Sequence, residues 1–198
     1  MSDAATPPMP PGAANELKWP KIIGILTIVF SGFNFFGAVM SFFTGRLLKF
    51  QMQMNKDLYN LQTTDIDQFL AKWNWHFVTS GLIGLITGLV LLFAGIFLLK
   101  EKKICRPLYL AYATVAILYA FYSIYVAVGS GMIDEQMNVM FGIGEGENIS
   151  DYPEAKVGRI SGIIGGVVGG VFAMVLPGFL LIWFMRSKIR ADVLSRFA

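Results

Sequence analysis

The chain has 198 residues, of which 55% are hydrophobic and 15% are charged, and its formal net charge is +3 at pH 7. Soluble domains carry about 25% charged residues, so this composition excludes an ordinary soluble domain. The single cysteine excludes a disulfide within the chain, and a single histidine cannot build a conventional zinc site.

The N-terminal segment has the composition of a tail. Residues 7–11 hold four prolines, and residues 1–17 contain neither the basic region nor the apolar run of a cleavable signal peptide. We therefore expect 1–17 to be a disordered, proline-rich cytoplasmic tail, with a proline-rich ligand for a partner domain as the alternative. The first apolar stretch is expected to direct membrane insertion itself.

Four apolar stretches without a charged residue dominate the rest of the chain. They cover residues 22–45, 77–99, 107–133 and 160–185. Each reaches the roughly 20 residues that a helix needs to cross about 30 Å of hydrocarbon. Residues 18–198 are therefore predicted to form an all-α integral membrane protein, a four-transmembrane-helix bundle. The predicted spans lie at about 20–46, 76–99, 107–129 and 159–186.

The basic residues predict the orientation. Ten of the sixteen lie on the side that holds both termini and the connection 100–106, and four of these ten are in that short connection. The other six are spread over two outer loops, at about 47–75 and 130–158. Because Lys and Arg near span ends resist translocation, both termini are predicted to be cytoplasmic. We expect a multi-pass protein of the cell membrane, with the bacterial inner membrane as the preferred assignment.

The first helix is predicted to continue beyond the membrane. Apolar residues recur every three or four positions through 47–62, with polar residues between them, which indicates an amphipathic helix. A second short apolar stripe follows at Ile66, Phe69, Leu70 and Trp73. We expect the two pieces to form a small helical outer cap on the bundle, or to lie flat in the headgroup region. The glycine-rich, acidic segment 142–155 is expected to be a solvated loop.

Small residues follow one face of the fourth span. They recur at spacings of three and four, and several pairs have the GxxxG spacing that lets two membrane helices approach closely. These residues are Gly162, Gly165, Gly166, Gly169, Gly170 and Ala173. The face is either a dimer interface or sliding gate, or a packing surface inside one bundle. Pro177 and Gly178 then predict a bend, which is either a hinge or a fixed kink.

Polar groups inside the spans are few. Asn34 in the first span and Tyr119 and Tyr122 in the third lie at mid-depth, where their polar atoms need partners. Asn34 is the natural partner for the two hydroxyls, with Thr87 and Ser123 as the next candidates. These three residues are expected either to join helices by hydrogen bonds or to line a polar pocket or water-filled path.

Asp, Glu, Lys, Arg and His are missing from all four apolar stretches. Proton and ion relays usually require such groups, so a proton-coupled carrier is disfavoured. We expect no enzyme activity, catalytic residue, cofactor, metal or nucleic-acid partner. The first hypothesis is an accessory or scaffold subunit in the lipid bilayer, which associates with itself or with another membrane protein through its small-residue faces. The second is a small oligomeric channel or permeability protein, gated around the glycine-rich fourth span.

Overall fold

The computed structural model of the chain describes residues 18–54, 63–144 and 147–196. The predicted tail 1–17 and the segment 55–62 of the predicted outer extension lie outside these described residues. Within the described ranges the regular structure is entirely helical, without a strand.

Four long helices dominate the fold. They are α1 (Lys18–Met54), α3 (Thr63–Leu99), α4 (Cys105–Gly129) and α6 (Pro153–Met185). The shortest, α4, has 25 residues, which at about 1.5 Å each is longer than the hydrocarbon core of a membrane. All four are long and apolar enough to span a membrane, which confirms the all-helical prediction with four candidate spans.

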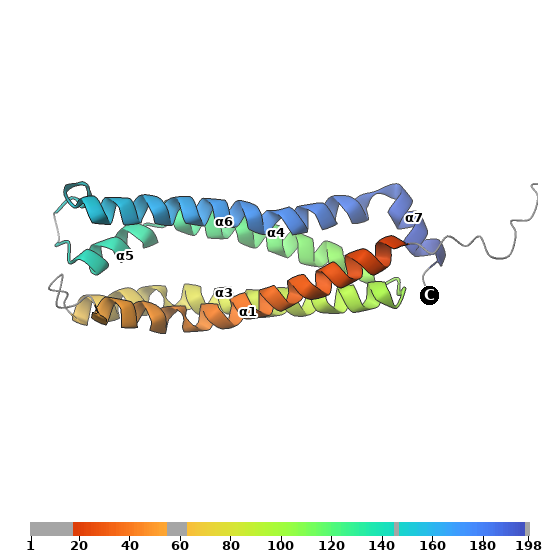
Figure 1. Cartoon of the computed structure of the whole chain (residues 1–198), viewed down its shortest axis with the longest axis horizontal. Helices are drawn as coiled ribbons and strands as arrows, with labels where there is room; N and C mark the ends of the chain where they lie inside the picture. Colours follow the sequence, from red (N-terminus) through yellow and green to blue (C-terminus); the bar gives the residue numbers. More distant parts are fainter. Residues whose placement is uncertain (1–17, 55–62, 145–146, 197–198) are drawn as a thin grey trace, which may run out of the picture.

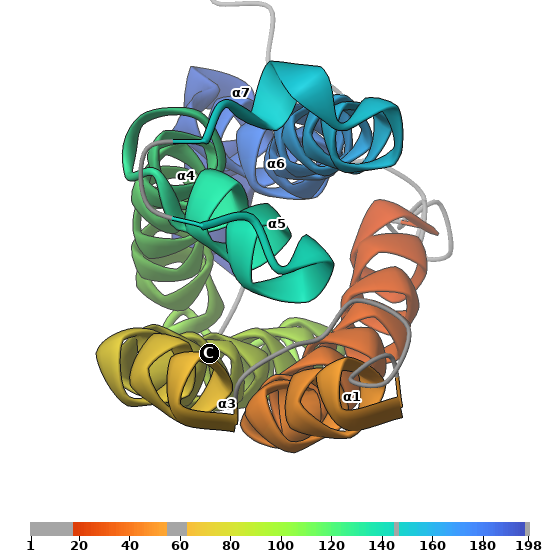
Figure 2. The same cartoon turned by 90° about the vertical axis from the view of Figure 1, so that its left-hand side faces the viewer.

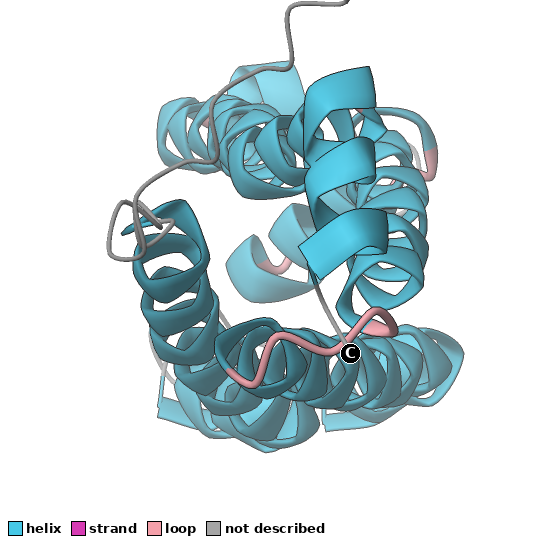
Figure 3. Cartoon of the chain, turned by 90° about the vertical axis from the view of Figure 1, so that its right-hand side faces the viewer, coloured by secondary structure: helices cyan, strands magenta, loops and turns pink. Residues whose placement is uncertain are grey.

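The long helices are arranged as two pairs, joined where α3 is followed by α4 (Figure 1). One hairpin is α1 packed along α3, and the other is α4 packed along α6. A short helix α5 (Met132–Phe141) lies between the two hairpins at one end, here called the α5 end (Figure 2). Another, α7 (Ser187–Arg196), crosses the opposite end, here called the α7 end (Figure 3). A single 3-10 turn, Ile149–Asp151, precedes α6.

Buried contacts hold the two hairpins together at the α7 end. The ring of Tyr109 in α4 stacks on Phe184 in α6, with centroids 4.5 Å apart and planes 14° from parallel. The Tyr109 hydroxyl also lies 2.8 Å from Thr27 Oγ1 in α1. Since the Thr27 hydroxyl donates to Ile23 O at 2.9 Å, Tyr109 is the donor to Thr27. One buried tyrosine therefore links three of the long helices.

A second apolar cluster lies at the α5 end. Met52 of α1 and Phe69, Trp73 and Phe77 of α3 are buried there against Val126 of α4. Met52, Phe69 and Trp73 lie outside the apolar stretches 22–45 and 77–99, because α1 and α3 both extend past those stretches. The long hairpin α1–α3 is therefore packed along most of its length.

Glycines of α3 allow α1 to approach closely. A methyl group added at Gly84 would lie 3.0 Å from Ala38 Cβ, and one added at Gly95 would lie 2.8 Å from Thr27 Oγ1. Both distances are shorter than the about 3.5–4.0 Å of ordinary carbon contacts. Small residues of the second span therefore let it pack closely against the first helix within the same chain.

Most apolar side chains of the long helices are not covered by the chain. At most 33% of the residues in any of the four candidate spans are buried. Phe33 and Phe36 on α1 are each 66% exposed, and Phe172 on α6 is 73% exposed. A water-soluble protein rarely leaves such continuous apolar surface open, whereas lipid tails cover it without cost.

The connections at the α5 end are more helical than the sequence analysis expected. Helix α1 runs to Met54, and α3 starts at Thr63, so the stripe from Ile66 to Trp73 belongs to the same helix as the second span. Within 130–158, α5 and the start of α6 are helical too. The sequence analysis predicted neither α5 nor α7.

Candidate functional site

The small residues of α6 divide between two surfaces. Gly162, Gly166 and Gly170 face α5 and α4: a methyl group added at Gly162 would lie 3.2 Å from Ile133 Cγ2. At Gly166 it would collide with Ala127 Cβ, and at Gly170 with Ile124 Cγ1. This half of the predicted face therefore packs closely against α4 and α5 within the chain.

The other half of the face is uncovered. A methyl group added at Gly165 or Gly169 would meet nothing within 4 Å, and both glycines are exposed. Ala173, one turn further along α6, is exposed as well. We refer to Gly165, Gly169 and Ala173 as the open glycine face.

A cavity of about 280 Å³ lies beside the open glycine face, between the two hairpins. All four long helices line it. Its polar lining consists of Asn34 from α1, Thr87 from α3, and Tyr112, Tyr119 and Ser123 from α4. Gly84, Gly169, Gly170 and Ala173 leave the space that larger side chains would fill. No charged side chain lines this cavity.

Hydrogen bonds satisfy most polar donors around the cavity. The Asn34 amide donates to Phe30 O at 3.2 Å, and the Thr87 and Ser123 hydroxyls donate to carbonyls four residues earlier in their helices at 2.7 and 3.0 Å. The Tyr112 hydroxyl interacts with Asn34. For Tyr119, no hydrogen bond to the hydroxyl occurs among the described residues. The cavity therefore offers acceptors and one hydroxyl to an occupant.

Pro177 adds an acceptor at the same place. Helix α6 continues through this buried proline and through Gly178. Because proline has no N–H, the carbonyl of Ala173 loses its helical donor. Ala173 is one of the residues that line the cavity.

The three polar residues singled out from the sequence are only partly brought together. Asn34 and Tyr119 line the same cavity, but Tyr122 does not. Its hydroxyl lies 3.2 Å from His76 Nδ1 on α3, and its ring is 6.0 Å from the ring of Tyr119. Tyr112, which is 4% exposed, meets Asn34 instead. The sequence analysis missed this tyrosine, although its spacing of seven from Tyr119 places both on one helix face.

Charged side chains fix α5 above the cavity at the α5 end. Glu135 accepts from Lys72 at 2.6 Å and from Trp73 Nε1 at 3.0 Å, which ties α5 to α3. Asp134 accepts two hydrogen bonds from Arg159, at 2.5 and 3.2 Å, which tie α5 to α6. Gly131 and Gly142 flank α5 with left-handed backbone (φ 75° and 64°). Glycine adopts this conformation readily, so the chain can turn sharply at both ends of α5.

The comparisons with known proteins do not identify the chain: no protein family, curated protein or solved structure matches it. Among the described residues, no group of three His, Cys, Asp or Glu side chains is placed to hold a metal ion.

Proposed function

We propose that this chain is a non-enzymatic, multi-pass membrane protein that binds another transmembrane helix along its open glycine face. In this proposal the four long helices form a transmembrane bundle with both termini in the cytoplasm and the α5 end outside. The helical ends of α1 and α3, together with α5, form the outer cap. The protein acts as an accessory or scaffold subunit, and its partner is a second copy or another membrane protein.

One observation carries the proposal: Gly165 and Gly169 have open space where a side chain would be, although their neighbours Gly166 and Gly170 pack against α4. Inside a membrane, close backbone approach is the main advantage that such glycines offer. The adjacent cavity adds Asn34 and Tyr119 as polar groups that a partner helix can contact. A partner helix would thus find both small residues and hydrogen-bonding groups on this side.

Photo-crosslinking in the native membrane tests this proposal. On the helical wheel of α6, Phe172 lies next to the open glycine face. Val171 lies about 100° round the helix from Phe172, on the side away from that face. Both are exposed, at 73% and 54%, so benzoylphenylalanine fits at either position. We expect a crosslinked product of defined mass from position 172 and little from 171.

The variant Gly169→Leu serves as the specificity control in this experiment. Its Cβ would meet nothing within 4 Å, and its longer side chain would occupy the open face and the cavity that Gly169 lines. It should therefore abolish the product while the close contacts of Gly166 and Gly170 with α4 are kept. Equal crosslinking from positions 171 and 172, or a product that survives Gly169→Leu, would refute the proposed interface. The mass of the product distinguishes a second copy from a different protein.

The cavity supports a second candidate function, a small oligomeric channel or permeability protein. Its polar lining lies between spans, and the proline in α6 frees a carbonyl beside it. Liposomes with the purified protein should then release small polar solutes. Ala116 of α4 also lines the cavity, so filling the cavity by Ala116→Leu should block the release. Liposomes that stay sealed at high protein density would rule out this alternative.

A further inference from the structure

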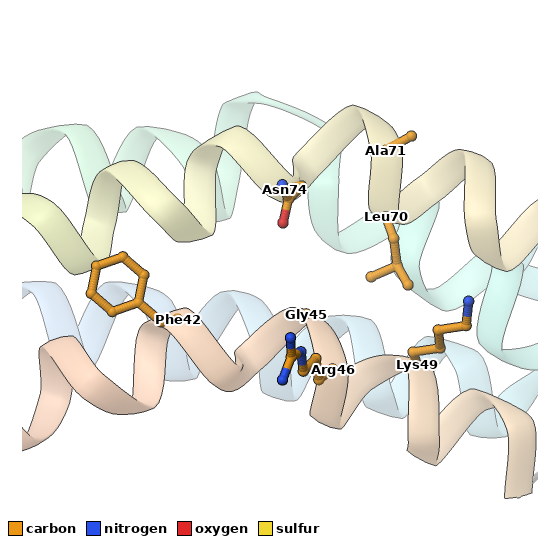
Figure 4. Close-up of a pocket in the computed structure, with 7 residues that line it drawn as sticks. All are labelled: Phe42, Gly45, Arg46, Lys49, Leu70, Ala71 and Asn74. Atoms are coloured by element: carbon orange, nitrogen blue, oxygen red, sulfur yellow. The ribbon is translucent and has the colours of Figure 1, made fainter.

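A second site lies far from the cavity, in a crevice between α1 and α3 near the α5 end (Figure 4). Its basic groups are Arg46 and Lys49 of α1, which lie one turn apart. Asn74 of α3 points into the crevice from the opposite side. Phe42 and Leu70 provide apolar walls. The crevice has a volume of about 460 Å³ and is open to the surroundings.

The position of the crevice along α1 sets its depth in a membrane. Residues 22–45 carry no charge, and Arg46 is the first charged residue after them. A charged side chain at the end of an apolar stretch lies at the boundary between hydrocarbon and headgroups. Phe42, one turn earlier, is on the hydrocarbon side of that boundary, and Lys49, one turn later, is on the headgroup side.

The charges in the crevice are not fully neutralised by the chain. Lys49 forms an ion pair with Asp67 of α3, with Nζ and Oδ1 2.7 Å apart. Arg46 has no acidic partner among the described residues, and no carboxylate lines the crevice. The guanidinium of Arg46 is therefore available to an anion, and the ammonium of Lys49 would be shared between that anion and Asp67.

Small residues keep the crevice open. Gly45 and Ala71 line the crevice from α1 and α3. A methyl group added at Gly45 would come to 3.7 Å from Phe77 Cδ2 and 3.9 Å from Asn74 Oδ1, so a larger side chain there would fill space beside Asn74. Arg46 and Lys49 both belong to α1. The side-chain amide of Asn74 adds N–H donors from the α3 side of the crevice.

We propose that this crevice binds the phosphate group of a phospholipid in the leaflet at the α5 end. A guanidinium donates two parallel hydrogen bonds to phosphate oxygens, and an ammonium and an amide complete a donor set for such an anion. The apolar walls below the donors suit the glycerol and the first carbons of an acyl chain. The depth of Arg46 favours a lipid over free phosphate, because a lipid already holds its phosphate at this level.

Lipid titration of the purified protein in detergent, read by native mass spectrometry, tests the proposal. The probes are phosphatidylglycerol, a glycolipid with the same acyl chains but no phosphate, and inorganic phosphate alone. We expect phosphatidylglycerol to bind with a defined stoichiometry and at least about tenfold more tightly than the glycolipid, since charged hydrogen bonds are lost without phosphate. Inorganic phosphate alone is expected to show no binding at comparable concentration.

Four variants separate this site from general attraction to a basic protein. Arg46→Gln should weaken phosphatidylglycerol binding about tenfold, and Lys49→Gln about threefold, because Lys49 is shared with Asp67. Asp67→Asn should strengthen binding about threefold, since it frees Lys49. Lys156→Gln on α6 removes an equal charge from an exposed position at the same end, and it should change binding less than about twofold.

Several results would overturn the proposal. Equal losses from Arg46→Gln and Lys156→Gln would show that the lipid is held only by net charge. Equal binding of the glycolipid would show that phosphate is not recognised. Binding of inorganic phosphate that matches and displaces the lipid would show that the natural ligand is a free anion instead. A weakening by Asp67→Asn would contradict the sharing of Lys49.

Discussion

The contrast between neighbouring glycines in α6 leads to a sharp prediction about stability. Alanine at Gly166 places a methyl group against Ala127 Cβ, whereas alanine at Gly165 places it in open space. Since Ala127 Cβ is fixed to its backbone, no rotamer change can relieve the collision. Helices α4 and α6 would have to separate by roughly 1 Å to restore the about 3.5 Å of two carbons in contact.

Overpacking of this kind costs about 1–3 kcal/mol. We therefore expect Gly166→Ala to lower the free energy of unfolding by about 2 kcal/mol relative to Gly165→Ala, or about 30-fold in the equilibrium constant. Any change in helix propensity from glycine to alanine is shared by the two variants, so their difference isolates the packing effect.

The assay is unfolding by SDS in mixed micelles, followed by the near-ultraviolet circular dichroism of the tryptophans. The double variant Gly166→Ala with Ala127→Gly should recover most of the lost stability, because it moves the methyl group from one helix to the other. Equal stability of the two single variants would show that α4 and α6 do not pack through Gly166, and the division of α6 into two faces would then be wrong.

Three further predictions concern polar contacts. Tyr109→Phe removes the hydrogen bond to Thr27 and should lower the free energy of unfolding by about 1 kcal/mol in the same SDS assay; no change would show that the bond contributes nothing. Glu135→Gln weakens the link between α5 and α3, so backbone amides of α5 should exchange hydrogen faster, and unchanged rates would contradict this role. The hydrogen bond from the Tyr152 hydroxyl holds the pKa of Glu147 below its usual range, so Tyr152→Phe should raise that pKa in an NMR titration. The small stabilisation from this bond is present above the ordinary glutamate pKa and is lost as the pH falls through the lowered one, and an unchanged Glu147 titration would refute the contact.

The four candidate spans could be predicted from the sequence because their signal is local. A charge-free stretch of 23 or more residues has few alternatives to a membrane helix. Three of the four stretches lie within one long helix, and the stretch 107–133 runs through α4 to Gly129 and on into the start of α5. The extension of the first helix to Met54 also follows from local periodicity. Helix α5 is different: it is ten residues long, and its ends are set by two left-handed glycines whose φ angles the sequence does not reveal.

The cavity was less predictable, because it depends on which helices are neighbours. Asn34 and Tyr119 share a cavity, but the assignment of Asn34 as a partner for Tyr122 did not anticipate that His76 lies 3.2 Å from that hydroxyl. The separation of Gly165 from Gly166 likewise requires knowledge of where α4 lies, since both glycines belong to the same periodic pattern.

The pairing of consecutive helices bears on how the protein is made. Because α1 packs mainly on α3, and α4 on α6, each hairpin buries its main contact surface against its nearest long neighbour in the chain. The first hairpin can therefore complete its packing while the second is still being synthesised. The contacts between the hairpins, such as those of Tyr109 with Thr27 and of α5 with α3, must wait for both halves. Two separately translated fragments divided within residues 100–104 would accordingly retain all the information needed to reassemble.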